Sequence, residues 1–133
     1  MNVVGVRTGG LKTVGEIFAA NRLTFREQQN GIAIAKALLS TRAAGAPVVD
    51  AKGRYIGFIN ELDVLKALEA GKDLNSLAAE DLMQLGPIAV HNFITIADAV
   101  RRMEDRCELN LPVEKDGRVA YSVSRHDLLR AWI

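Results

Sequence analysis

The sequence is poor in cysteine, in aromatic residues and in charge of one sign. Cys107 is the single cysteine, so an intramolecular disulfide is excluded and a reducing compartment is indicated. Aromatic residues make up only 5% of the 133 residues, so a core must be built from aliphatic side chains. Seventeen basic residues against sixteen acidic ones give a net charge of +1, unlike the one-sided charge of proteins that bind nucleic acids or anionic membranes.

Long apolar runs and targeting signals are also missing. No run approaches the roughly 18 apolar residues of a membrane span, and MNVVGVRTGG at the start is not a signal peptide. His91, His126 and Cys107 do not stand at metal-ligand spacing, so no metal site is predicted. The pattern also assembles no nucleophile, base and orienting group, so no catalytic residue is predicted. We expect a cytoplasmic protein that is not an enzyme and binds neither nucleic acid nor a membrane.

What the sequence does contain is an internal repeat that covers almost the whole chain. Pro47-Val48 matches Pro112-Val113 at an offset of 65, and Gly53-Arg54 matches Gly117-Arg118 at an offset of 64. One residue is therefore lost between these pairs, in the stretch DAKG of the first copy and KDG of the second. A surface turn tolerates such a deletion well, so the repeat predicts that the same fold is written twice.

Each copy predicts the order strand, helix, strand, strand, helix. Ile96, Ala99, Val100, Met103 and Cys107 form one apolar stripe at helical spacing after the N-cap residue Thr95. Turns with Asp and Gly join the two central strands of each copy. The predicted elements are short strands at 23–25 and 87–90, helices after residues 30 and 95, hairpins at 46–60 and 111–124, and closing helices after residues 60 and 124.

About 60 residues bury little core and are only marginally stable alone, so the two copies should pack together. The predicted fold is α/β (α+β), with two βαββα repeats related by a pseudo-twofold axis. Residues 1–71 form the first repeat with an N-terminal segment, and residues 72–133 form the linker and the second repeat.

The junction of the last strand and last helix is the best conserved part of the repeat within this chain. GFINELDVLKAL at 57–68 matches YSVSRHDLLRAW at 121–132, with Asp63 aligned on Asp127. Asn60 and Ser124 precede these aspartates by three positions. Both pairs fit an ordinary helix N-cap with an acidic third residue. A carboxylate can equally accept hydrogen bonds from a ribose diol, and a hydroxyl at a helix start suits a phosphate. Both interpretations stay open.

The sequence resembles the cystathionine-beta-synthase (CBS) domain family in its tandem form. The resemblance lies in GAPVVDAKGRYIGFINELDVLKAL, in DLMQLGPIAVHNFITIADAVRRM and in LPVEKDGRVAYSVSRHDLL. It implies a regulatory module whose clefts between the repeats bind adenosine-containing ligands such as AMP, ADP, ATP or S-adenosylmethionine.

The resemblance also implies the ligand-binding residues. The family motif is glycine, two apolar residues, Ser or Thr, two variable residues and Asp, in which Asp holds the ribose and Ser or Thr the phosphate. The first copy has Asn60 in place of Ser or Thr, and the second has Tyr121 in place of glycine. The second copy keeps both polar residues, and Arg125 adds charge. The residues that the resemblance implies are Ser124, Asp127, Arg125, Ser122, Met83, Ile88, Leu109 and Asn110 for the second copy, and Asn60, Asp63, Phe58, Phe18, Leu23, Ala43, Ala44 and Gly45 for the first.

We therefore expect a stand-alone regulatory module that senses cellular energy through an adenine nucleotide and signals to an unidentified effector protein. The nucleotide would be a ligand and not a catalytic cofactor. The alternative is an interaction and dimerisation scaffold whose clefts no longer bind a ligand, which the substitutions at Asn60 and Tyr121 favour. The resemblance implies a homodimer in either case.

Overall fold

The computed structural model of the chain describes residues 12–17 and 22–133. The elements of the first half are η1 (Val14–Glu16), β1 (Phe25–Arg26), α1 (Gly31–Thr41), β2 (Gly45–Val49), β3 (Tyr55–Asn60) and α2 (Glu61–Glu69). Those of the second half are η2 (Leu74–Ser76), α3 (Ala79–Leu82), β4 (Val90–His91), α4 (Ile96–Arg106), β5 (Asn110–Lys115), β6 (Arg118–Ser124) and α5 (Arg125–Trp132). The predicted order of strand, helix, strand, strand and helix is confirmed in both halves.

Each half contains one three-stranded sheet, with the strand orders β1-β2-β3 and β4-β5-β6. The first strand of each sheet is parallel to the second, and the second and third form an antiparallel hairpin. A bulge lies between Val48 and Val49, and another lies at the equivalent position between Val113 and Glu114. Both predicted hairpins are confirmed. The shorter turn of the second hairpin is made by Asp116 and Gly117, whose φ angles of 54° and 78° suit a two-residue reversal.

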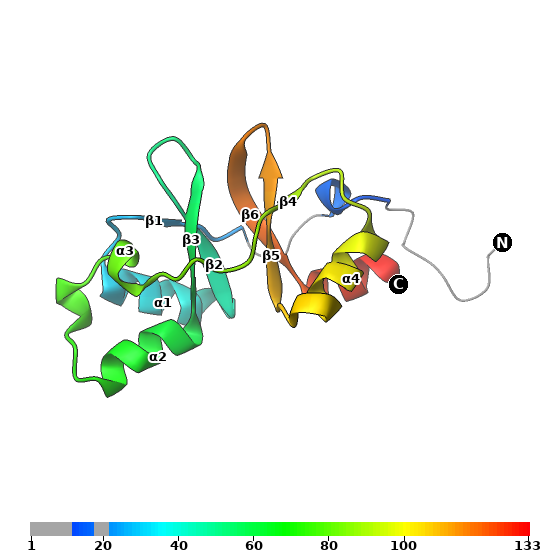
Figure 1. The fold of residues 1–133 in the computed structure, drawn as a ribbon. Helices are drawn as coiled ribbons and strands as arrows, with labels where there is room; N and C mark the ends of the chain where they lie inside the picture. Colours follow the sequence, from blue (N-terminus) through cyan, green and yellow to red (C-terminus); the bar gives the residue numbers. More distant parts are fainter. Residues whose placement is uncertain (1–11, 18–21) are drawn as a thin grey trace.

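The helices lie on the outer sides of the two sheets, which meet between the halves. Figure 1 shows the two halves side by side, with α1 and α2 flanking the first sheet, α4 flanking the second, and the hairpin turns at the top. Asn30 begins α1 because its side-chain oxygen accepts a hydrogen bond from the Ile32 N–H at 2.8 Å. Thr95 begins α4 in the same way and accepts from the Asp98 N–H at 3.0 Å. Both residues are N-caps, as the sequence indicated for Thr95.

The apolar stripe of α4 is only partly buried. Ile96, Ala99 and Met103 belong to the core, whereas Val100 is 39% exposed. Cys107 is also exposed, so the prediction that it continues the buried stripe is wrong. The reason is local, because Cys107 adopts a left-handed conformation (φ 53°) that ends the helix one residue after Arg106.

Each half has its own apolar core. Each core also includes a lead-in segment, the name used here for the stretch that contains Val14 and Ile17 and precedes the first half, and for the stretch from α3 to Gln84 that precedes β4. Val14 and Ile17 pack in the cluster of the second half, around Val113 and Val123. In exchange, Ala79 and Leu82 of α3 pack in the cluster of the first half. The two halves therefore cannot separate without opening both cores.

Two main-chain bridges make this exchange symmetrical. Thr13 pairs with Thr95, and Ala78 pairs with Asn30. At the offset of 65, Thr13 is equivalent to Ala78 and Asn30 to Thr95. Each lead-in segment thus reaches the residue that caps the first long helix of the other half, which is the relation expected of a pseudo-twofold pair.

Candidate functional site

The second copy of the junction motif forms a complete capping box at the start of α5. Ser124 ends β6, and its N–H donates to Asp127 Oδ2 at 2.9 Å. In return, the Asp127 N–H donates to Ser124 Oγ at 3.1 Å. The capping interpretation is therefore confirmed for this pair. It leaves the N-terminus of α5 with an ordered hydroxyl and a carboxylate that is only 6% exposed.

The first copy forms the same box and one further bond. The Asn60 N–H donates to Asp63 Oδ2 at 2.8 Å, and the Asp63 N–H donates to Asn60 Oδ1 at 2.9 Å. The second carboxylate oxygen, Asp63 Oδ1, accepts a hydrogen bond from the side-chain amide of Gln84. Both oxygens of Asp63 therefore have a partner within the chain.

A cavity of about 400 Å³, here named the second cleft, contains the second motif. Its lining combines that motif with the end of α1 and the start of β2 in the first half. The residues that line it are Thr41, Arg42, Ala43, Ala44, Gly45, Leu109, Asn110, Ser122, Ser124, Arg125, His126 and Asp127.

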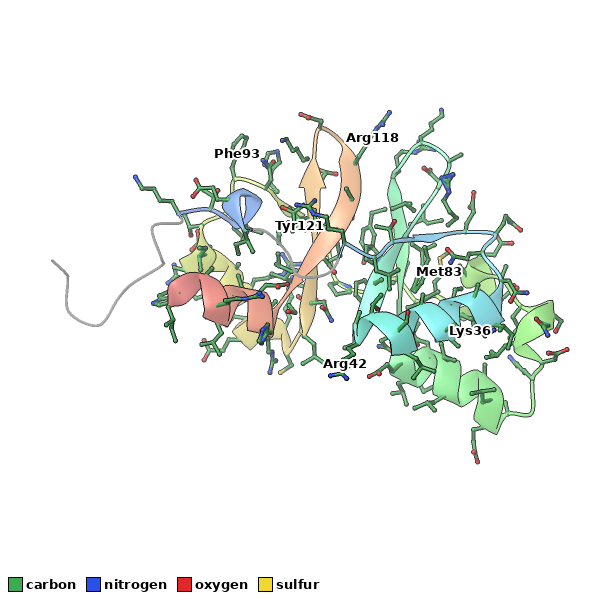
Figure 2. All side chains as sticks on the ribbon, turned by 180° about the vertical axis from the view of Figure 1, so that it is seen from behind. Lys36, Arg42, Met83, Phe93, Arg118 and Tyr121 are labelled. Carbon is green, nitrogen blue, oxygen red and sulfur yellow. The ribbon has the colours of Figure 1, made fainter. Side chains whose placement is uncertain are left out.

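The second cleft is rich in cationic and donor groups. Arg42 is the left-handed C-cap of α1, and Figure 2 shows it at the end of that helix nearer to the second half. Arg125 is the first residue of α5, and its Nε donates to the carbonyl of Glu108 at 3.2 Å. His126 follows it in the lining. Two guanidinium groups and a helix N-terminus beside a hydroxyl make this cleft suited to an anion.

A smaller cavity of about 270 Å³, here named the first cleft, contains the first motif. The residues that line it are Ala44, Phe58, Asn60, Asp63, Gln84, Gly86, Pro87, Cys107, Glu108, Leu109 and Asn110. Its charged lining residues are the carboxylates Asp63 and Glu108, and none of the described lining residues is Lys or Arg.

Equivalent positions around the two clefts thus carry different charges. At the offset of 65, Arg42 of the second cleft corresponds to Cys107 of the first, and Ala43 corresponds to Glu108. Arg125 stands where the first copy has Glu61, at the offset of 64. The doubled fold therefore presents one cationic and one acidic cleft.

The structure brings together most of the residues that the sequence predicted as ligand-binding, but in different groups. Ala43 and Gly45, assigned to the first copy, line the second cleft, whereas Ala44, Leu109 and Asn110 line both clefts. Each cleft therefore takes part of its wall from the copy that does not supply its motif. Phe58, Asn60 and Asp63 lie in the first cleft, and Ser122, Ser124, Arg125 and Asp127 lie in the second.

Four predicted residues lie elsewhere. Met83 packs against the core of the first half, and so does Leu23. Ile88 is 60% exposed, and its carbonyl accepts a hydrogen bond from Arg102 Nη2 at 2.7 Å. Phe18 lies outside the described residues. The assignment of Met83 and Ile88 to the second cleft is thus not what the structure gives, because α3 packs on the first half.

The motif glycine has a packing role in the first half. A Cβ atom added to Gly57 would lie 2.5 Å from Met83 Sδ and 2.9 Å from the Gln84 carbonyl oxygen. Only glycine therefore lets the lead-in segment approach β3 this closely. At the equivalent position, Tyr121 is buried, and the Arg22 guanidinium lies 4.7 Å from the centre of its ring. Burial raises the pKa of the Tyr121 hydroxyl, an effect that Arg22 partly offsets.

Sequence reasoning missed several cleft residues. Arg42 and Gln84 had no motif to mark them, and Glu108 lies in a segment without regular structure. The repeat offset alone could have indicated Arg42 and Glu108, because it places them beside residues already assigned to the clefts. His126, which the sequence singles out only as a histidine outside metal-ligand spacing, is exposed and lines the second cleft.

Metal ligation and membrane insertion find no support in the part of the chain that the structure describes. Residues 12–17 and 22–133 contain no group of three His, Cys, Asp or Glu side chains placed to hold a metal ion. In the same residues, no helix combines the length and the apolar character that crossing a bilayer requires.

A doubled α/β module with one cleft per motif is the class of protein that these observations define. The family model of the CBS domain matches residues 14–70 and again residues 79–133. The chain therefore belongs to the CBS domain family and contains a tandem pair of these domains.

Comparison with individual proteins gives moderate similarity. "Uncharacterized protein MK0525" from Methanopyrus kandleri is 28% identical over 120 residues, which are 89% of this chain and 61% of that protein. Arabinose 5-phosphate isomerase KdsD from Pseudomonas aeruginosa is 30% identical over 87 residues, 65% of this chain and 27% of the enzyme. The chain thus spans less than two thirds of either relative.

Among solved structures, the CBS domain pair of protein MJ0100 was determined in complex with 5′-methylthioadenosine and S-adenosyl-L-methionine. It is 25% identical to this chain, has a TM-score of 0.74, and the match covers 89% of this chain and 93% of that one.

Proposed function

We propose that this protein is a regulatory CBS module that binds a phosphorylated adenosine ligand, such as AMP, ADP or ATP, in the second cleft. The observation that carries the proposal is the combination of Ser124 and Asp127 with two arginines, Arg42 and Arg125, in one cavity of about 400 Å³. A cavity of that size is within the range of small-molecule sites.

The chemistry divides the cleft into two parts. Asp127 is the residue to accept hydrogen bonds from the ribose hydroxyls, because a carboxylate can accept from both members of a cis-diol. Ser124 Oγ and the N-terminus of α5 are placed to receive a phosphate, where the helix dipole favours negative charge. Arg42 and Arg125 add charge-assisted donors to the same anion. The small residues Ala43, Ala44 and Gly45 leave main-chain groups open on the opposite wall.

The relatives support the ligand class. MJ0100 holds two adenosine-containing ligands in a CBS pair of the same fold. In this chain the second cleft holds Arg42 and Arg125, which favours phosphorylated adenosine over an uncharged nucleoside.

A regulatory module needs an output. We infer that ligand binding alters the contact with an effector protein, because the ligand sits between the halves and touches both of them. Such a switch requires that the ligand bind two states with different affinity. The alternative, a scaffold without ligand, is favoured by the first cleft, where Asn60 and Asp63 serve the helix cap. We further propose that the nucleotide reports the energy state of the cell and that the protein is cytoplasmic.

The test is calorimetric titration of the purified chain with AMP and with adenosine. We expect AMP to bind more tightly than adenosine, and Arg42→Gln and Arg125→Gln each to weaken AMP binding by about 10- to 100-fold, since a hydrogen bond to a charged group contributes about 1.5–3 kcal/mol. Adenosine binding should change little in either variant.

Arg54→Gln is the matched control, because Arg54 pairs with Asp50 at 2.8 Å in a hairpin turn and lines neither cleft. AMP, ADP and ATP all failing to bind the folded wild-type chain would leave the scaffold as the better account.

A further inference from the structure

Gln84 lines the first cleft and comes from the segment that leads into the second half. Gln84 is fixed to β3 by two main-chain hydrogen bonds. The Phe58 N–H donates to its carbonyl at 2.8 Å, and its own N–H donates to the Phe58 carbonyl at 3.0 Å. Because the main chain is held on both sides, the Gln84 side chain is held beside Asp63 in the lining of the cleft.

The Gln84 amide donates a hydrogen bond to the oxygen of Asp63 that takes no part in the helix cap. Asp63 Oδ2 accepts from the Asn60 N–H at 2.8 Å, and Oδ1 accepts from Gln84 Nε2. Asp63 is only 7% exposed. An amide N–H on that oxygen has the same donor chemistry as a ribose hydroxyl, so the chain itself supplies the hydrogen bond that a ligand would offer.

We propose that Gln84 is a selectivity residue that closes the first cleft to adenosine ligands by occupying Asp63, so that the protein binds its ligand in the second cleft alone. This inference rests on the proposed function. A ligand that enters the first cleft must displace the Gln84 amide and leave a polar group unpaired or repaired by water, which costs affinity.

The charge of the first cleft sets the ligand class that an opened site would take. Its charged lining residues are Asp63 and Glu108. Glu108 Oε1 has no hydrogen-bond partner and lies 3.4 Å from Arg102 Nε. Because Glu108 is paired with Arg102, Asp63 is the carboxylate whose charge no arginine or lysine of the described lining balances, and it repels a phosphate. The opened cleft would therefore accept adenosine and reject AMP.

The experiment counts bound adenosine per chain by calorimetric titration. Gln84→Ala removes the amide and leaves the main-chain bonds to Phe58 in place. We expect Gln84→Ala to bind one more adenosine per chain than the wild type, with the number of bound AMP molecules unchanged. The same gain is expected of Gln84→Ser, whose hydroxyl is too short to replace the amide, and thermal melting checks that each variant is folded.

Gln28→Ala is the matched control, because Gln28 Nε2 donates to Glu80 Oε2 at 3.0 Å in a similar amide–carboxylate contact outside both clefts. It should bind the same number of adenosine molecules as the wild type. Repeating the Gln84→Ala titration in an Asp127→Ala background separates this inference from the proposed function, since the gained site does not use the second cleft.

A folded Gln84→Ala protein, together with Gln84→Ser, that gains no adenosine site would overturn the role of Gln84. Two adenosine molecules bound to each wild-type chain would do the same. Neither result depends on whether AMP binds the second cleft.

Discussion

Ser124 and Asp127 hold each other through their main chains as well as their side chains. The Ser124 N–H donates to the Asp127 carboxylate at 2.9 Å, and the Asp127 N–H donates to the Ser124 hydroxyl at 3.1 Å. The Ser124 hydroxyl also donates a hydrogen bond to the same carboxylate oxygen, at 3.1 Å. The two residues proposed to meet the ribose and the phosphate are therefore already ordered by the start of α5. A ligand finds them pre-organised, which lowers the entropic cost of binding.

We predict that Asp127→Ala weakens nucleotide binding more than Asp63→Ala. Loss of a hydrogen bond to the charged Asp127 should cost about 1.5–3 kcal/mol of binding free energy. Asp63 already pairs with Asn60 and Gln84, so its loss should leave AMP affinity nearly unchanged. Calorimetric titration of both variants measures the difference.

Stability must be measured beside affinity in these variants, because both aspartates complete a capping box. Urea unfolding should show a loss of about 0.5–2 kcal/mol for Ser124→Ala, the range found for N-cap residues. A folded Asp127→Ala protein with wild-type AMP affinity would remove the second cleft from consideration.

We predict that Gly71→Ala destabilises the protein by about 1 kcal/mol through the main chain alone. Gly71 has φ +77°, and a Cβ atom added there would meet nothing within 4 Å. The Gly71 N–H donates to the Leu68 carbonyl at 3.0 Å, and the Lys72 N–H donates to the Ala67 carbonyl at 3.0 Å. These two bonds end α2 in a Schellman motif. Urea unfolding is the measurement, and Gly71→Asn should lose less. Equal stability of Gly71→Ala and wild type would contradict the prediction.

We predict that Tyr55 makes the protein more sensitive to alkali. Burial, and then the charge of Glu108, raise the pKa of the Tyr55 hydroxyl above its usual value of 10.0. Above pH 10 the unfolded chain has therefore lost a proton that the folded protein keeps. The free energy of unfolding is unaffected below pH 10 and falls as the pH rises beyond it, by up to about 1.4 kcal/mol per pH unit for one proton.

Tyr55→Phe tests this effect. At neutral pH the variant should be about 0.5–1.5 kcal/mol less stable, because the hydroxyl donates to the Pro87 carbonyl at 2.6 Å. Above pH 10 its stability should fall less steeply than that of wild type, since Tyr121 titrates in both. Parallel curves for the two proteins between neutral pH and pH 11 would argue against the raised pKa of Tyr55.

We predict a homodimer that pairs through the helices. Leu65 and Leu68 on α2 are 58% and 50% exposed, and Leu129 on α5, equivalent to Leu65, is 61% exposed. A cavity of about 650 Å³ between α4 and α5 is lined by Leu129 and Trp132, among others. A second copy can cover equivalent apolar positions on both halves at once, and groups of exposed apolar side chains of this kind mark protein–protein contacts.

Light scattering at micromolar concentration should give a dimer for the wild type and a monomer for Leu129→Glu. Phe93→Glu is the control, because Phe93 is 72% exposed but lies in the loop before α4, stacked on His91. That variant should remain dimeric. A monomeric wild type would contradict the prediction.

The sequence by itself determined the repeated element order. Apolar spacing, the residues Asn30 and Thr95 before helices, and Asp-Gly turns act over a few neighbouring residues, so their signals can be read along the chain. The hairpins and α1, α2, α4 and α5 follow from such local rules. The offset of 65 changing to 64 placed the deletion in a turn for the same reason. The capping boxes at Asn60 and Ser124 are local as well.

Only the tertiary structure decided how the copies share their surfaces. Val14 packs in the second core and Leu82 in the first, an exchange that no local pattern records. The packing of the two halves places Ala43, Ala44 and Gly45 beside Ser124 and Asp127, and the exchange brings Gln84 onto Asp63. Contacts between residues far apart in the chain depend on how whole elements pack. The two motifs could therefore be identified from the sequence. Which residues surround each motif, and hence the charge of each cleft, depends on how the halves pack.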